Sequence, residues 1–255
     1  MRGYDDRDAR RMPGVERIVD LGDGVAAVAT NTWLAQQAVD AVVVEWDSAL
    51  PYPATTDAMI AAIEAGFDTE PNSELRADGD VTALPEGAQL IEAEYRTPFL
   101  AHATMEPMNA TALISSDGLQ VWCGNQAPTF VRDACAEEAG LPVSQVAVTT
   151  TYLGGGFGRR GELDFAVYAT RLAKAMPGTP VQLTWSREED MTHDFYRPAT
   201  IARLRGAVAD GTAVMLDAAV SGPSVSQQAL ERWTGFAPGG PDKVHVEGLF
   251  NQPYG

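Results

Sequence analysis

The sequence predicts an α+β fold in which helices and strands are mixed along the chain. Short apolar runs repeatedly flank tight-turn sequences such as Asp117-Gly118 and Asp210-Gly211, which is the pattern of β-hairpins. Amphipathic runs of helical period alternate with them, and the clearest covers residues 128–139 and ends at Gly140. With 45% hydrophobic and 21% charged residues, the chain has the composition of a globular protein that buries a core.

Residues 1–50 are interpreted as a first small α+β unit. Its expected elements are a strand (15–21), a tight turn (22–24), a partner strand (25–29), a helix capped by Asn31 or Thr32, and a third strand (41–46). A unit of about fifty residues buries little surface, so we do not expect it to fold as an independent domain.

Residues 51–87 are interpreted as an acidic connector with a short helical pattern at 56–65. Between Glu64 and Glu94 there are nine acidic residues and one basic residue, Arg76. A solvated linker is the favoured interpretation of this charge, and an acidic docking surface is the alternative.

Residues 88–255 have the pattern of a second domain. The expected elements are strands at 90–95, 110–115 and 119–123, a helix at 128–139, an extended segment at 143–153, a helix at 163–175, a strand at 180–186 and a hairpin of 201–208 with 213–221. An irregular tail rich in Gly and Pro follows from residue 235.

Charge and cysteine content exclude several classes of protein. The formal net charge of −17 repels nucleic-acid phosphates, so no nucleic-acid partner is expected. The two cysteines, Cys123 and Cys135, lack the paired spacing of a zinc site, and no apolar run reaches the length of a transmembrane span. Because the charged start leads at once into a compact pattern, we expect Met1 to lie inside a longer sequence.

The strongest chemical signal is the glycine-rich run from Gly154 to Gly161, placed between an extended segment and a helix. Backbone amides converge at such a turn, so an anionic group could bind there beside Arg159 and Arg160. Gly156, Gly158 and Gly161 also satisfy GxGxxG, the fingerprint of an NAD-binding domain, although little of the chain remains after the motif to complete the sheet of such a domain. A turn that only packs the helix on the sheet is the third interpretation.

Two further clusters carry candidate residues. His102 and Glu106 lie in an apolar segment, where burial could turn either into an acid–base group or leave it structural. Asn125 and Gln126 stand at the end of a strand, before Pro128 opens a helix, so they either bind a ligand or cap that helix.

Taken together, these segments resemble the molybdenum hydroxylases. The Met-Glu-Pro at 105–107, Asn125-Gln126-Ala127-Pro128, the loop at 154–159 and the stretch Trp185 to Pro198 occur in the same order in that family. The similarity is closest to the molybdopterin-binding large subunit of isoquinoline 1-oxidoreductase and to bacterial aldehyde dehydrogenases of the xanthine oxidase family. It implies a partial α/β hammerhead domain at residues 1–50 and the first portion of a molybdopterin-binding domain at 88–255.

The resemblance also implies roles for single residues. Gln126 would hydrogen-bond the apical oxygen ligand of molybdenum. Backbone amides of Gly155, Gly156, Phe157 and Gly158 would face the same ligands and the pterin. Arg159, which would also border the cofactor, stands where many members have glycine. His102 and Glu106 would lie near the substrate funnel, and no side chain of this chain would bind the metal directly.

Members of the family are about three times as long as this chain, and their base glutamate and further pterin-binding segments have no match here. The resemblance therefore implies a fragment, inactive alone and able to lack cofactor. In the full subunit it implies molybdopterin, in the cytosine dinucleotide form, and an N-heterocycle or aldehyde substrate, with water as the oxygen source. The implied partners are the rest of the large subunit and a small subunit with 2Fe–2S clusters, which two cysteines could not hold. A periplasmic location is expected over a cytoplasmic one.

Overall fold

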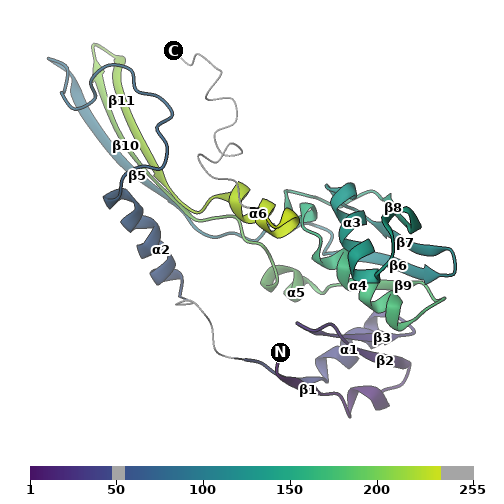
Figure 1. The fold of residues 1–255 in the computed structure, drawn as a ribbon. Helices are drawn as coiled ribbons and strands as arrows, with labels where there is room; N and C mark the ends of the chain where they lie inside the picture. Colours follow the sequence, from purple (N-terminus) through teal and green to yellow (C-terminus); the bar gives the residue numbers. More distant parts are fainter. Residues whose placement is uncertain (48–54, 237–255) are drawn as a thin grey trace. The chain divides into compact units, whose positions relative to one another are not determined.

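The computed structural model describes residues 1–47 and 55–236, which form a mixture of helices and strands in two compact units (Figure 1). The first unit combines Met1–Leu50 with Ala101–Phe195, and the second combines Pro51–Leu100 with Tyr196–Gly255. This grouping differs from the linear division into 1–50, 51–87 and 88–255, because two strands that lie far apart in the sequence pair in the second unit.

The N-terminal part of the first unit follows the predicted order of elements. They are β1 (Gly3–Asp5), a 3-10 turn (Ala9–Arg11), β2 (Val15–Asp20), β3 (Val25–Ala29), α1 (Thr32–Asp40) and β4 (Val43–Glu45). Strands β2 and β3 form the expected hairpin, and the Asn31 side chain caps α1 by accepting from the Leu34 N–H at 3.0 Å. The sequence did not predict β1, which pairs with β4. The hammerhead assignment for this part stays a prediction.

The larger part of the first unit is a four-stranded sheet covered by two helices. Its elements are β6 (Asn109–Ser115), β7 (Gly118–Cys123), α3 (Pro128–Ala139), β8 (Val146–Thr150), α4 (Asp164–Ala175), β9 (Val181–Thr184) and α5 (Arg187–Thr192). The strand order is β8-β7-β6-β9, with β7 and β8 parallel and the other pairs antiparallel. Helices α3 and α4 pack against each other and the sheet, around fully buried side chains such as Val121, Val131 and Phe165.

The topology of this sheet brings four loops to one edge. Strand β7 ends there and so does its parallel neighbour β8, since Cys123 pairs with Thr150. The antiparallel strand β6 begins at the same edge, and β9 ends there, where Asn109 pairs with Thr184. The residues before β6 and those after β7, β8 and β9 are therefore neighbours in space.

The second unit is built on a three-stranded antiparallel sheet in the order β11-β10-β5. Its elements are α2 (Thr56–Ala65), a 3-10 turn (Gly66–Asp68), β5 (Gln89–Thr97), β10 (Thr200–Ala209), β11 (Thr212–Ser221) and α6 (Val225–Thr234). The helix expected at 56–65 and the hairpin of β10 with β11 are confirmed, whereas α6 was not predicted. The tail from residue 237 lies outside the described residues.

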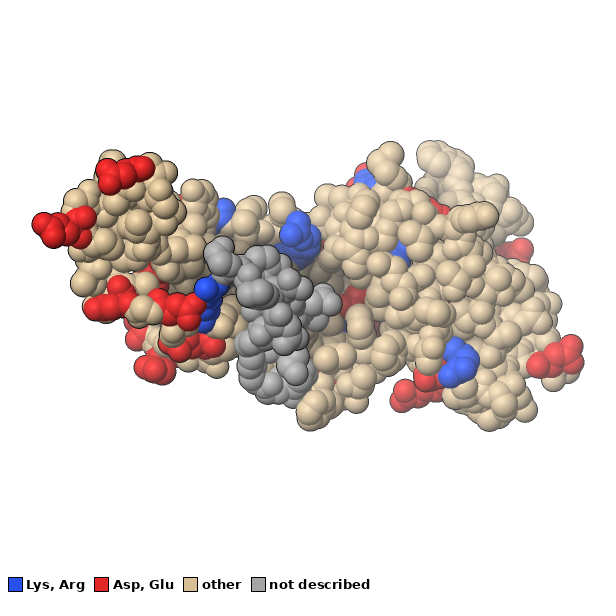
Figure 2. Space-filling model, turned by 90° about the horizontal axis from the view of Figure 1, so that it is seen from above, with Lys and Arg blue, Asp and Glu red and all other residues tan. Residues whose placement is uncertain are grey.

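One face of this sheet carries charged pairs and contacts α2. Glu94 binds Arg203 at 2.9 Å, Arg96 binds Glu64 of α2 at 2.8 Å, and the Ser221 hydroxyl donates to the Ile63 carbonyl at 2.6 Å. Part of the acidic stretch is therefore not a solvated linker, because it supplies a helix and ion pairs to the sheet. Figure 2 shows acidic side chains gathered over the part of the molecule that holds this sheet.

The opposite face of the same sheet is apolar and exposed. Register places three cross-strand rows on it: Ile91, Gly206 and Leu216; Ala93, Leu204 and Ala218; Tyr95, Ala202 and Val220. Tyr95, Leu216 and Val220 are 60%, 69% and 70% exposed. Among the described residues, no helix has both the length and the apolar character that a membrane crossing requires.

The two faces predict losses of different size for the same kind of truncation. Ile201, on the charged face, is fully buried, so we expect Ile201→Ala to lower the free energy of unfolding by about 2–5 kcal/mol. Leu216→Ala on the exposed face should cost less than about 1 kcal/mol, mainly through strand propensity. Urea denaturation of both variants measures the difference. Equal losses of unfolding free energy would contradict the assignment of Leu216 to an exposed face.

Candidate functional site

The glycine-rich loop lies at the sheet edge described above, between β8 and α4. Three of its residues have left-handed backbone: Gly155, Phe157 and Gly158, with φ of 102°, 54° and 97°. The chain can turn this sharply because two of the three lack a Cβ atom. Phe157 has one, and a left-handed residue with a side chain carries strain of the kind found at binding sites.

Gln126, at the end of β7, is fixed to this loop by two hydrogen bonds. Its side-chain Oε1 accepts from the Gly158 N–H at 3.1 Å, and its own N–H donates to the Arg160 carbonyl at 2.9 Å. A Cβ atom at Gly156 would lie 2.7 Å from Cδ of Gln126, so any side chain at this position would displace the Gln126 amide. The structure thus joins Gln126 to Gly156 and Gly158, residues that the sequence analysis grouped only through the resemblance.

Glu106, in the segment before β6, is bound to the other end of the loop. Its carboxylate accepts from the Gly154 N–H and from the Arg160 guanidinium, both at 2.8 Å. Burial alone would raise the pKa of Glu106, but the Gly154 N–H, Asn109 and Arg160 together hold it below its usual value. Glu106 therefore stays ionised and is held in place.

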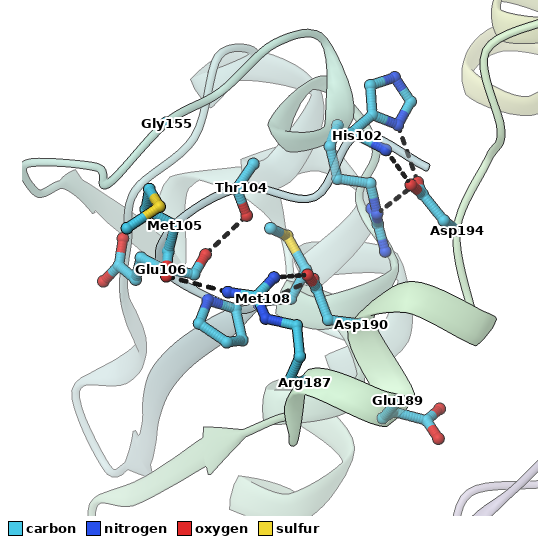
Figure 3. A network of polar contacts seen from close by, with 12 residues as sticks. His102, Thr104, Met105, Glu106, Met108, Gly155, Arg187, Glu189, Asp190 and Asp194 are labelled. Carbon is cyan, nitrogen blue, oxygen red and sulfur yellow. Dashed lines mark hydrogen bonds and ion pairs between the residues drawn. The ribbon is translucent and has the colours of Figure 1, made fainter. Parts of the chain in front are cut away.

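His102 faces a buried carboxylate. Its backbone N–H donates to Oδ2 of Asp194 at 2.5 Å, and its ring Nδ1 lies 2.8 Å from Oδ1 of the same residue (Figure 3). Burial would raise the pKa of Asp194, but His102 and Arg159 outweigh this and lower it. The ring Nε2 of His102 lies 3.7 Å from where a Cβ of Gly158 would be, so His102 borders the loop.

The two arginines of the loop do not offer their charge to a ligand. Arg159 is 1% exposed, forms a bidentate pair with Asp164 at 2.9 and 2.8 Å, and lies over the Trp185 ring. Its Nε is 3.2 Å from Asp194, close enough for an ion pair, although the geometry is not that of a hydrogen bond. Arg160 is fully buried. The expectation that these two arginines lend their charge to a bound anion is corrected, since both charges are paired with carboxylates inside the protein.

Helix α5 braces the segment that carries Glu106. The buried carboxylate of Asp190 accepts from the Met108 N–H at 3.2 Å, and Arg187 binds both Asp190 at 2.8 Å and the Met105 carbonyl at 2.9 Å (Figure 3). The sequence analysis did not predict this helix, and it used the stretch from Trp185 to Pro198 only for the resemblance, without a role for Arg187 or Asp190. A capping signal was present, because the Ser186 side chain accepts from the N–H of Glu189 three residues later.

The fold does not favour the alternative of an NAD site at Gly156, Gly158 and Gly161. A dinucleotide-binding domain has a largely parallel sheet, and here the only parallel pair among the described strands is β7 with β8. The described residues also contain no cluster of three or more His, Cys, Asp or Glu side chains that could hold a metal ion.

The residues present do fit a pterin cofactor. The loop combines close backbone approach at Gly156 with left-handed turns at Gly155, Phe157 and Gly158, and the Gly158 N–H sets the orientation of the neighbouring Gln126 amide. Large apolar side chains on the adjoining segments stay exposed, namely Met105 (85%), Tyr152 (fully) and Phe157 (68%). Neutral donors beside apolar surface suit a flat, partly anionic heterocycle.

Sequence comparison finds one matching domain family and similar chains among oxidoreductases. The profile of the molybdopterin cofactor-binding domain matches residues 67–224. The beta subunit of isoquinoline 1-oxidoreductase of Brevundimonas diminuta is 29% identical over 215 residues, which is 80% of this chain and 27% of the relative. The membrane-bound aldehyde dehydrogenase [pyrroloquinoline-quinone] of Gluconacetobacter polyoxogenes is 28% identical over 219 residues, 81% of this chain and 28% of the relative.

Structure comparison agrees with this result at the level of the fold. The crystal structure of quinoline 2-oxidoreductase from Pseudomonas putida 86 superposes with a TM-score of 0.61 and 19% identity, over 86% of this chain and 33% of that one. The chain thus spans about a third or less of the length of these proteins. Because the profile covers more than half of the sequence, the chain belongs to the molybdopterin cofactor-binding domain family.

Proposed function

We propose that this chain forms one wall of the molybdenum-cofactor site in an oxidoreductase that hydroxylates N-heterocycles or oxidises aldehydes. The observation that carries the proposal is the docking of the Gln126 amide on Gly156 and Gly158, in a chain whose family binds molybdopterin. The finer parts of the proposal are the cytosine dinucleotide form of the pterin and water as the source of oxygen.

The residues have separate parts in this wall. Because Oε1 of Gln126 accepts from Gly158, its Nε2 is the end that donates to an oxygen ligand of the metal. The backbone amides of Gly155 to Phe157 would face the cofactor, whereas the Gly158 N–H is held by Gln126. Arg159 supports the loop through its pair with Asp164. When bound, the cofactor supplies the two-electron redox centre, and the protein supplies neutral donors fixed in advance.

A truncation tests the part assigned to Gln126. In a subunit that contains this chain and carries molybdenum, Gln126→Ala should lower turnover of an aldehyde or N-heterocycle by about 10²-fold, the effect typical of losing one fixed donor. Turnover and metal content by mass spectrometry are the measurements. The matched control is Gln182→Ala on the exposed side of β9. Unchanged turnover and molybdenum content in Gln126→Ala would favour a non-catalytic interaction module.

We further propose that the other walls of the site come from outside these 255 residues. The chain spans about a third or less of its relatives, and one face of its second sheet exposes Tyr95, Leu216 and Val220. The proposed partners are the rest of a large subunit and a small subunit with 2Fe–2S clusters. The location in the periplasm stays a prediction.

Assays on the isolated chain test whether the site is complete. We expect the chain, purified from a host that makes the molybdenum cofactor, to show no turnover of aldehydes or N-heterocycles. Molybdenum, pterin and pyrroloquinoline quinone are measured on the same sample. Stoichiometric molybdenum with turnover would overturn the proposal of an incomplete site, and stoichiometric pyrroloquinoline quinone would overturn the assignment of the cofactor.

Glu106 was expected near the substrate, but its contacts indicate that it anchors the glycine-rich loop. A carboxylate that accepts from both Gly154 and Arg160 is held by the loop and is a poor proton acceptor at neutral pH. We therefore propose that Glu106 fixes the loop and that it is not the base of the reaction.

The lowered pKa of Glu106 predicts a pH-dependent contribution to stability. A carboxyl group with a lowered folded-state pKa stabilises the protein above its unfolded pKa of about 4.3, and the contribution is lost as the pH falls through the folded value. The gap in unfolding free energy between wild type and Glu106→Gln should therefore be largest near pH 6 and shrink towards pH 3. Urea denaturation across this range measures it, with the exposed Glu137→Gln as control. A gap that does not change with pH would contradict the ion pair.

A further inference from the structure

We infer that Arg160 is the positioning residue of the cofactor wall, since its buried guanidinium sets the distance between Gln126, the glycine-rich loop and Glu106. The inference deepens the proposed function and rests on it for the nature of the ligand. The geometry itself belongs to the chain and can be tested without any cofactor.

The guanidinium of Arg160 binds three separate segments. Its Nε donates to the Gly155 carbonyl at 3.0 Å, Nη1 to the Gly124 carbonyl at 3.1 Å, and Nη2 to the Glu106 carbonyl at 2.9 Å and carboxylate at 2.8 Å. These partners come from the loops before β6, after β7 and after β8. No two of the three loops are adjacent in sequence, so the side chain is a cross-link between them.

The backbone of Arg160 completes the arrangement. Its carbonyl accepts from the Gln126 N–H at 2.9 Å. The Gly158 N–H, two residues earlier in the loop, donates to Oε1 of the same glutamine. A shift of Arg160 would therefore move Gln126 through the backbone and Gly155 through the side chain. The donor group of Gln126 and the amides of the loop keep one fixed spacing only while Arg160 stays in place.

Arginine is required here for its shape as well as its charge. The planar guanidinium presents donors in several directions at once, and each points at a different carbonyl or at the carboxylate. A lysine ammonium is a single point that cannot reach all of them. Without the guanidinium, Glu106 and the carbonyls of Gly124 and Gly155 would lose their charged partner inside the protein.

The neighbouring Arg159 shows that charge alone does not make a positioning residue. It is equally buried, but it pairs with Asp164 in α4 and lies over the rings of Trp185 and Phe195. Arg159 therefore ties the loop to the helix behind it, whereas Arg160 ties together the segments that form the wall.

Hydrogen exchange of the backbone amides, followed by mass spectrometry on the chain as it stands, tests the inference. In Arg160→Met we expect peptides that contain Gln126 and 154–158 to exchange at least tenfold faster than in wild type. Peptides of α3 and α4 should keep their rates, because their core does not depend on this side chain. Arg160→Lys should give only a partial return to the wild-type rates.

The matched control is Arg171→Met in α4 of the same unit. Arg171 also binds a carboxylate, that of Glu138 at 2.9 Å, and a backbone carbonyl, that of Leu21. Its loss should leave exchange at 154–158 unchanged. If Arg160→Met does not fold, Arg160→Lys decides, with faster exchange confined to the loop as the supporting result.

Two results would overturn the inference. One is unchanged exchange at 154–158 in a folded Arg160 variant. The other is uniformly faster exchange over the whole unit in both variants, which would make Arg160 a general support of the fold. Failure of the proposed function has a different signature. A larger subunit that contains this chain would then lack molybdenum and pterin, or would keep its turnover in Gln126→Ala, while the exchange pattern of the chain stayed as expected.

Discussion

The ion pair between the fully buried Arg160 and the partly exposed Glu106 is the interaction on which the site depends. An arginine placed in the interior loses its hydration, and burial lowers its pKa, while Glu106 acts in the opposite direction. This cost is offset only if every donor finds a partner, and the partners available are carbonyls of three loops. The requirement to satisfy one guanidinium therefore fixes the positions of the loops at the edge of the sheet.

Sheet topology makes this possible before any side chain acts. The parallel pair of β7 and β8 and the antiparallel partners β6 and β9 deliver four chain segments to one edge. The site is then completed by charges that turn inward, with Arg159 on Asp164 and Asp194, and Arg160 on Glu106. The Phe157 side chain on the loop is 68% exposed, whereas both arginines are paired inside the protein, so neither arginine adds a cationic patch to the loop.

The sequence predicted helices and strands well where the hydrophobic period and the turn or capping residues lie close together in the chain. The helix from Pro128 to Ala139 with its Gly140 end, and the hairpin over Asp210-Gly211, appear as expected. Pairing of β5 with β10 could not be predicted, because distant strands leave no local signal, and this pairing interleaves the two units. The buried role of Arg160, which was expected to lie beside a bound anion, was missed for a related reason. An arginine in a glycine-rich run looks solvent-exposed until its carbonyl partners, which lie far away in the sequence, are known.

The contacts also limit what this chain can do by itself. His102 and Glu106 were the two side chains that the sequence offered as acid–base groups, and both are held in pairs, one by Asp194 and the other by Arg160. For Glu106 the pairing also lowers the pKa, so this carboxylate orients the loop and is a poor proton acceptor at neutral pH. We therefore propose that this chain binds and positions the cofactor, and that the base of the reaction belongs to a part of the subunit outside these 255 residues.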